Sequence, residues 1–199
     1  MMQPVEILGF IGGGIGMFFG LPQVREVRRQ GHGNGVSLVS WILLFGVSIS
    51  WAAYGFHLKS PSASITNIGS AVMSGSLILA LVSKERKPLL WLALYAAVLS
   101  TLVLTLPSKI VSAMLIALVF AQTPQVIKSY RNFRLRITSA VSMNALGVSS
   151  ASVICWIFYG FLADIPLIAT TSCIALSINL TIITLEVLAR KRSRSANPQ

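Results

Sequence analysis

The tripeptide Pro22-Gln23-Val24 is repeated at Pro124-Gln125-Val126, and each copy opens the same longer pattern. The motif Trp-x-x-Tyr-Gly-Phe follows both copies, at 51–56 and at 156–161. The tripeptides are 102 residues apart and the tryptophan motifs are 105 apart, so the second copy has three additional residues between its motifs. An internal duplication of this kind predicts two similar structural units around a shared axis, where a pathway or a binding site commonly lies.

The composition is that of a membrane protein. Of the 199 residues, 54% are hydrophobic and 11% are charged, and the mean hydropathy is +0.77. Soluble domains usually need about 25% charged residues to cover their surface. The apolar runs approach the ~20 residues that a helix needs to cross a bilayer, where lipid offers the backbone no hydrogen-bond partner. We therefore predict an all-α membrane protein.

Seven apolar runs are long enough to be transmembrane helices, and this number has a structural reason. A unit of three helices ends on the side of the membrane opposite to its start. A fourth span is therefore needed before a second unit can repeat the direction of the first. This 3+1+3 arrangement predicts two parallel three-helix repeats, related by an axis along the membrane normal. The predicted spans are 5–24, 37–57, 63–83, 88–106, 108–127, 138–162 and 165–188.

The spans divide the chain into four regions, and basic residues orient them. The regions are a first repeat (1–87), a linker helix (88–107), a second repeat (108–188) and a basic, flexible tail (189–199). All but two of the 16 Lys and Arg residues follow spans one, three and five or lie in the tail; the exceptions are Lys59 and Lys109. The positive-inside rule then predicts an integral protein of the cell membrane, with the N-terminus outside and the C-terminus in the cytoplasm. The net charge of +11 therefore indicates topology and contact with lipid, not a nucleic-acid partner.

These motifs resemble those of the SWEET sugar transporters and their half-sized bacterial relatives, within the broader PQ-loop (MtN3-like) group. The shared pattern is a Pro-Gln at the end of the first helix, a basic loop, Trp-x-x-Tyr-Gly late in the second helix and an Asn, here Asn67, in the third. The resemblance covers nearly the whole chain. It implies a seven-helix transporter fold, which also carries amino acid, pyruvate and receptor functions.

The repeated prolines interrupt the first and fifth spans. Proline has no backbone N–H, so Pro22 leaves the carbonyl of Phe18 without its helical donor and Pro124 does the same to Phe120. In the family such prolines are proposed to act as hinges; the alternative is that each merely ends its helix. The second and sixth spans contain no proline, so the four-proline hinge of many SWEET proteins does not carry over. The predicted cytoplasmic hinge consists of Pro22, Gln23, Pro124 and Gln125.

Trp51 and Asn67 lie at similar depths in the second and third spans, so they can face one another. Their counterparts in the second unit are Trp156 and Ser172. An aromatic face stacks on the C–H surface of a sugar ring, and an amide both donates to and accepts from hydroxyls. The family's pocket uses Trp and Asn from both units, and Ser172 departs from that pattern. The alternative for the tryptophans is an interfacial aromatic belt.

Asn179 lies two helical turns beyond Ser172, and its counterpart Ser74 lies two turns beyond Asn67. Such a polar stripe on the third and seventh spans is typical of a hydrated path, so Asn179 is a fifth candidate for substrate binding. The alternative is interhelical hydrogen bonding by small polar residues, which is common in membrane proteins.

Lys59 and Asp164 occupy equivalent positions at the outer ends of the two units. With Tyr54 and Tyr159 they form the predicted extracellular gate, because an exposed ion pair is cheap to break. Outer Tyr and Lys–Asp contacts are proposed in the family. The alternative is two unrelated, solvated charges.

No Asp, Glu, Lys, Arg or His is expected near the middle of a span, whereas proton-coupled carriers usually need one there. We therefore predict passive, bidirectional uniport of small neutral sugars, mono- or disaccharides, by alternating access. No nucleophile–base cluster or metal-ligand spacing occurs, so we expect no enzyme activity, metal or cofactor. The alternatives are a PQ-loop carrier of another neutral metabolite or amino acid, and a non-transporting receptor or sorting protein. One chain can form a complete pathway, although a homo-oligomer is compatible with the sequence.

Overall fold

The computed structural model describes residues 3–18, 38–82, 87–135 and 142–196. Within these residues the chain forms helices and no strand, as predicted for an all-α protein. The helices are α1 (Pro4–Phe18), α3 (Leu38–His57), α4 (Pro61–Val82), α5 (Lys87–Thr105), α6 (Ser108–Val119), the 3₁₀ helix η1 (Phe120–Gln122), α7 (Thr123–Leu135), α8 (Met143–Leu162) and α9 (Pro166–Ala196).

Five of the helices in the described part of the chain are long and apolar enough to cross a membrane. They are α3, α4, α5, α8 and α9. Two shorter apolar helices, α1 and α6, correspond to the starts of the predicted first and fifth spans. Large side chains such as Leu90, Trp91 and Phe161 are exposed on the helix surfaces, as lipid-facing residues are in a bilayer. The predicted all-α membrane fold is confirmed.

The duplication is visible in the turns that close α3 and α8. In the first turn, Ser60 N–H donates to Gly55 O (2.9 Å) and Lys59 adopts a left-handed φ of 55°. In the second, Ile165 N–H donates to Gly160 O (2.8 Å), and its left-handed residue, Asp164, also has a φ of 55°. Each is a left-handed helix C-cap, and a proline then starts the next helix with a preset φ. We call this end of the molecule, which holds both turns, the turn end.

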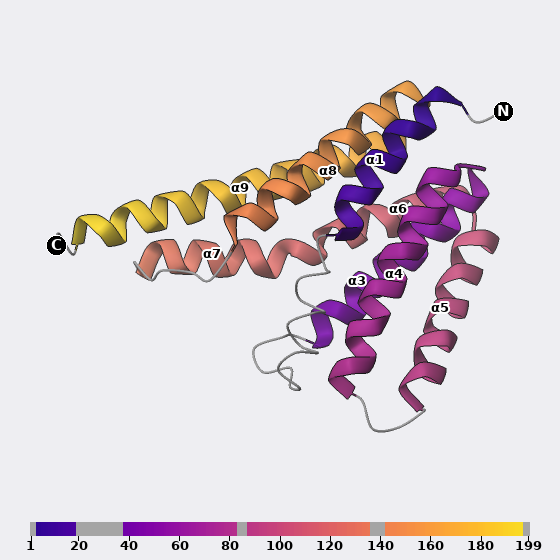
Figure 1. The fold of residues 1–199 in the computed structure, drawn as a ribbon, viewed down its shortest axis with the longest axis horizontal. Coiled ribbons are helices and arrows are strands. Elements are labelled where there is room, and N and C mark those ends of the chain that lie inside the picture. The colour runs from indigo at the N-terminus through magenta and orange to yellow at the C-terminus, as the bar shows by residue number, and fades with distance from the viewer. Residues whose placement is uncertain (1–2, 19–37, 83–86, 136–141, 197–199) are drawn as a thin grey trace.

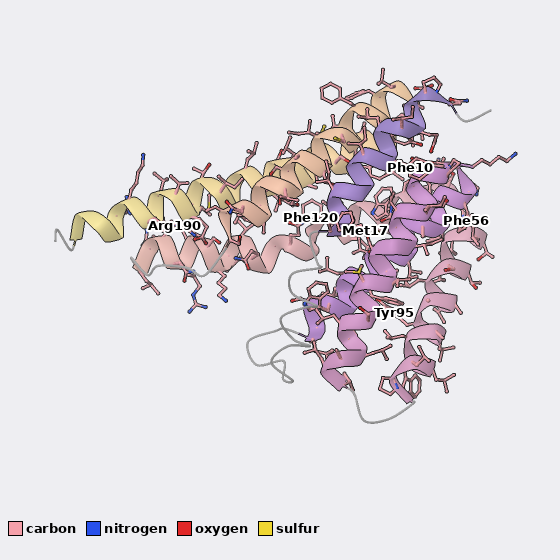
Figure 2. All side chains as sticks on the ribbon, viewed as in Figure 1. Phe10, Met17, Phe56, Tyr95, Phe120 and Arg190 are labelled. Carbon is pink, nitrogen blue, oxygen red and sulfur yellow. The ribbon has the colours of Figure 1, made fainter. Side chains whose placement is uncertain are left out.

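Each unit has its third helix in the middle. In the first unit α4 lies between α1 and α3, and in the second α9 lies between α7 and α8. The linker α5 packs mainly on α3, where the rings of Phe45 and Tyr95 stack with centroids 6.1 Å apart. Figure 2 shows Tyr95 directed from α5 toward the α3–α4 pair. Most of the surface of α5 remains uncovered, as expected for a helix that connects two units through lipid.

The two units meet unequally. The helix α1 packs closely along α8 of the other unit, whereas α3 and α6 touch over a short stretch only. In Figure 1 the α3–α4–α5 group and the α7–α8–α9 group approach one another near α1 and diverge toward their other ends. The units are therefore joined at the turn end and separated at the opposite end (Figure 1). We call this the basic end because Arg190 of α9 lies toward it (Figure 2).

Two helices continue beyond the predicted spans. The helix α7 extends past residue 127 to Leu135, and α9 extends through the basic residues to Ala196, where a flexible tail was predicted from 189. The two helices lie side by side (Figure 1), and the Arg192 guanidinium lies 4.1 Å from the centre of the Phe133 ring. Basic side chains near a helix C-terminus are favourable because they interact with the helix dipole. Both helices therefore continue past the spans predicted from hydropathy, because packing between α7 and α9 extends them.

Candidate functional site

Glycines allow α1 to lie against α4 of its own unit. A Cβ added at Gly9 would collide with the Ser62 side chain, and one at Gly13 would collide with Thr66. Further along the same pair, Met17 reaches across to Gly69, where an added Cβ would meet its sulfur; Figure 2 shows Met17 between α1 and α4. Small residues bring helix backbones close together in membranes, where van der Waals packing drives association.

A neighbouring glycine face of α1 lies against α8 of the other unit. A Cβ at Gly12 would lie 2.7 Å from Cβ of Cys155, and one at Gly16 would lie 2.8 Å from Oγ of Ser152. Ser152 Oγ donates a hydrogen bond of 2.7 Å to the Gly12 carbonyl. We call the packing of α1 against α4 and α8 the first seam. The equivalent packing of α6 against α9 and α3 is the second seam.

A cavity of about 210 Å³ lies between the two units. It is bounded by α3, α4, α6, η1, α8 and α9, so both units contribute to its wall. Its residues with polar atoms in their side chains are Trp51, Asn67, Gln122, Trp156, Thr171 and Ser172. Its aliphatic residues are Leu44, Val47, Ala63, Leu118, Val119, Ile168 and Ala175. A mostly apolar wall with a few converging polar groups is typical of a small-molecule site.

Four of the five residues predicted to bind substrate line this one cavity, namely Trp51, Asn67, Trp156 and Ser172. Asn67 Nδ2 donates 2.9 Å to the Ala63 carbonyl of its own helix. Its Oδ1 accepts no hydrogen bond from the described residues, which leaves an acceptor available at the cavity wall. The amide can therefore serve a hydroxyl group without first giving up a protein contact.

The two tryptophans make the same kind of aromatic contact in both units. Trp51 and Tyr54 form an edge-to-face pair with ring centroids 5.8 Å apart. Trp156 and Tyr159 form the equivalent pair at 5.2 Å. Edge-to-face contacts of this kind orient aromatic rings. Each unit therefore holds its cavity tryptophan by a tyrosine one turn nearer the turn end.

Asn179 does not line the cavity. It is buried, 1% exposed, and its Nδ2 donates 3.1 Å to Ser149 Oγ on α8. Its counterpart Ser74 is also buried and donates 2.8 Å to the Ser70 carbonyl of its own helix. Asn179 thus forms the interhelical hydrogen bond that was the alternative to the hydrated path, whereas Ser74 bonds within its own helix.

Gln122, which was not among the predicted residues, lines the cavity from η1. Proline at position 124 cannot supply the helical donor for the Phe120 carbonyl. Thr123 N–H donates to that carbonyl instead, which tightens one turn into a 3₁₀ helix. The sequence signal was present, because Gln122 is an amide in an apolar span two residues before the proline.

The two Pro-Gln motifs are described unequally, because Pro22 and Gln23 lie outside the described residues. In the second motif, Gln125 Nε2 donates 3.3 Å to Ser129 Oγ, which donates 2.6 Å to Glu186 Oε1 on α9. Ser129 and Glu186 are both fully buried, and Oε2 of Glu186 has no hydrogen-bond partner among the described residues. Gln125 is therefore connected to α9 instead of to the interrupted turn.

A buried carboxylate that sequence analysis missed lies at the turn end. Glu6, on the first turn of α1, is 7% exposed. It accepts a hydrogen bond of 2.8 Å from the Tyr159 hydroxyl and one of 2.7 Å from Ser62 N–H. Ser60 Oγ lies 3.4 Å from Glu6 Oε2 and 2.6 Å from the Tyr159 oxygen. The signal that could have revealed Glu6 is its position as the one acidic residue of the first predicted span.

The four predicted gate residues have different surroundings. Tyr159 is buried in the Glu6 network, whereas Tyr54 packs against an apolar cluster and stacks on His57 at 6.4 Å. Lys59 and Asp164 each occupy the left-handed position of a turn. The described residues contain no ion pair between them, so the expected Lys–Asp contact is not formed in this state.

Comparison with known proteins supports this geometry at the level of the fold. No protein-family model matches the chain, and no curated protein matches it. A solved structure, described as the 3.7 Å resolution structure of a eukaryotic SWEET transporter, matches with a TM-score of 0.73 and 13% sequence identity. The match covers 95% of this chain and 100% of that chain. The resemblance read from the motifs is thereby confirmed at the level of the fold: this chain has the fold of a SWEET transporter.

Proposed function

We propose that the protein is a membrane transporter that carries small neutral sugars passively, in both directions, by alternating access. One observation supports this proposal above the others. In a SWEET-like fold, a single cavity between two repeated units is lined by tryptophans from equivalent positions and by the amide of Asn67. The same pattern of residues gives no support to catalysis.

The chemistry of the cavity suits a neutral, hydroxyl-rich molecule. Tryptophan faces stack on the apolar face of a sugar ring, while Asn67, Gln122, Thr171 and Ser172 offer donors and acceptors to hydroxyls. No charged side chain belongs to the described wall of the cavity. An ionic substrate would therefore be desolvated without a partner, which is costly.

The arrangement of the units suits alternating access. The turn end is joined by α1 and α8, while the described helices diverge toward the basic end (Figure 1). With the orientation expected from the positive-inside rule, this state is closed to the outside. The 3₁₀ segment before Pro124 supplies a place where the fifth span bends, and we assign the same role to Pro22 in the first span.

Uptake by proteoliposomes tests this function. Labelled glucose and sucrose are supplied with and without a pH gradient, to the wild type and to Asn67→Ala. The matched control is Asn144→Ala, which makes the same change at an exposed position of α8 outside the cavity wall. We expect uptake that ignores the gradient, falls roughly tenfold in Asn67→Ala and is kept in Asn144→Ala. Absence of uptake of both sugars, or uptake only with a gradient, would contradict the proposal.

A further inference from the structure

Glu6 is a carboxylate buried where the two units meet. Its hydrogen-bond donors come from separate parts of the chain: Tyr159 from α8, the backbone N–H of Ser62 from α4, and Ser60 from the turn before α4. A buried charge is tolerated when such bonds replace its lost water, and bonds to a charged group are stronger than neutral ones. Glu6 and Ser62 belong to the first unit and Tyr159 to the second, so this network connects the units directly.

The network forms a layer between two hollows. A second hollow, of about 360 Å³, lies on the outer side, and Glu6, Ser60 and Tyr159 belong to its wall. On α8, Tyr159 lines this outer hollow, whereas Trp156, one turn deeper, lines the central cavity. Ile165, just before α9, lines the outer hollow, whereas Ile168, in the first turn of α9, lines the central cavity. The Glu6–Tyr159–Ser60 layer therefore separates the central cavity from the turn end.

Among the residues that the structure describes, the second seam has no such network. In the second repeat, the position equivalent to Glu6 is Ser108, that equivalent to Ser60 is Ile165 and that equivalent to Ser62 is Leu167. At the second seam, Leu167 and Tyr54 pack instead against a buried apolar cluster. The carboxylate is therefore not required by the repeated fold. Hydrogen bonds can be exchanged for bonds to water when a seam opens, whereas separating an apolar cluster exposes its surface to water.

We propose that Glu6 is a positioning residue of the transport cycle. It holds Tyr159 against the first unit while the cavity is closed at the turn end, and it releases Tyr159 when that end opens. This role rests on the proposed alternating access between the two ends. It requires no sugar to be present, so it can be tested separately from the substrate.

Accessibility of a cavity cysteine tests the proposal. The full chain is prepared with Cys155→Ala and Cys173→Ala, and Ala175→Cys places a single thiol on the cavity wall. In sealed vesicles of each orientation, a membrane-impermeant thiol reagent is added from the turn end or from the basic end. Glu6→Gln and Tyr159→Phe are compared with this background. The control is Tyr130→Phe, the same change at an exposed tyrosine on α7.

We expect Glu6→Gln and Tyr159→Phe to react roughly tenfold faster from the turn end, which is the change in population expected from losing a hydrogen bond to a charged group. Labelling from the basic end should slow, because the same molecules now spend less time open there. The labelling rates of the double variant should be close to those of either single variant, because both substitutions remove the same interaction.

Two results would overturn the role of Glu6. One is labelling from the turn end that stays at the background rate in both variants. The other is faster labelling from both ends, which loosened structure alone would produce. If Glu6→Gln fails to fold, Tyr159→Phe still decides the question, because it keeps the bond between Glu6 and Ser62 N–H. A chain that moves no sugar but shows the reciprocal change in labelling would overturn the proposed substrate and support the role of Glu6.

Discussion

The two seams occupy equivalent places in the duplication but are built from opposite kinds of residue. In the first seam, α1 presents Gly9 and Gly13 to α4, and the close approach leaves room for hydrogen bonds. In the second, the equivalent positions on α6 are Val111 and Leu115, which are buried in an apolar cluster with Ala53 and Val103. The linker α5 contributes Val103 to this second seam.

This difference indicates that equivalent contacts in a repeated fold can have different roles. A seam made of small residues and hydrogen bonds is held by a few directional contacts, so it can open and close at a modest net cost. A seam made of large apolar side chains loses buried area wherever it separates. We therefore expect the first seam to be the one that opens at the turn end, while the second remains packed and serves as the pivot.

Gly13→Leu should have the largest effect, because it copies into the first seam the residue found at the equivalent place in the second. A Cβ at position 13 already collides with Thr66, so a leucine forces α1 and α4 apart. We expect little or no folded protein, because the added side chain has no space between the two helices and the backbone itself must move. Size-exclusion chromatography after detergent extraction measures the folded fraction. Gly14→Leu is the matched control, because an added Cβ there meets nothing within 4 Å. Normal yield of Gly13→Leu would show that the seam is looser than described.

Leu115→Ala should have the next largest effect, because it removes the centre of the second seam. Leu115 is fully buried, and truncation of a buried leucine costs about 2–5 kcal/mol through lost contacts and the space left behind. Thermal unfolding in detergent measures this loss. Leu104→Ala, on the exposed surface of α5, is the control and should change stability little. Equal losses in the two variants would contradict the packing of the second seam.

Asn67→Ala and Ser172→Ala compare two equivalent polar side chains of the cavity wall, one from each unit. Asn67 presents a long amide and Ser172 a short hydroxyl at the equivalent position of the second unit. We expect Asn67→Ala to lower sugar uptake roughly tenfold, about 1.4 kcal/mol, and Ser172→Ala to lower it less. The ratio of kcat to KM in proteoliposomes measures both. Equal losses of uptake in the two variants would mean that the amide and the hydroxyl contribute equally to substrate binding.

Lys59→Gly and Asp164→Gly should have the smallest effects, and they test where the two units are still alike. Both residues adopt a left-handed φ of 55°, which glycine adopts without a steric penalty. Because no ion pair joins them in this state, we expect stability to stay within about 1 kcal/mol of the wild type, since relief of the left-handed strain is offset by the greater freedom of glycine in the unfolded chain. Thermal unfolding and sugar uptake measure the two consequences. A shared loss of more than this amount would point to a Lys–Asp contact in another state of the cycle.

Much of the fold could be predicted because the duplication repeats short-range signals. Gly55 and Gly160, each followed six residues later by a proline, marked two identical turns, and the structure gives both the same backbone geometry. The tryptophan motifs and Asn67 marked residues that lie on one cavity wall, because helices that follow one another in a unit face each other. Local sequence was sufficient wherever a feature depended on a single turn or a single helix.

The remaining features depended on contacts between distant parts of the chain. Glu6 acquires its role from Ser62 and Tyr159, which no local pattern connects to it. Asn179 lies on the face that periodicity predicted, but periodicity does not say that α8 covers that face with Ser149. Gln122 reaches the cavity through a local change of helix type that hydropathy does not register.

A reversible cross-link across the first seam tests the central claim most directly. Val5→Cys on α1 and Ala163→Cys after α8 place two thiols on the wall of the outer hollow, in a chain that also carries Cys155→Ala and Cys173→Ala. A short, cleavable bis-maleimide would join them with the turn end closed. The account predicts that sugar uptake stops when the link forms and returns when it is cleaved. Uptake that continues through the cross-linked protein would contradict it, because the first seam would then not have to open.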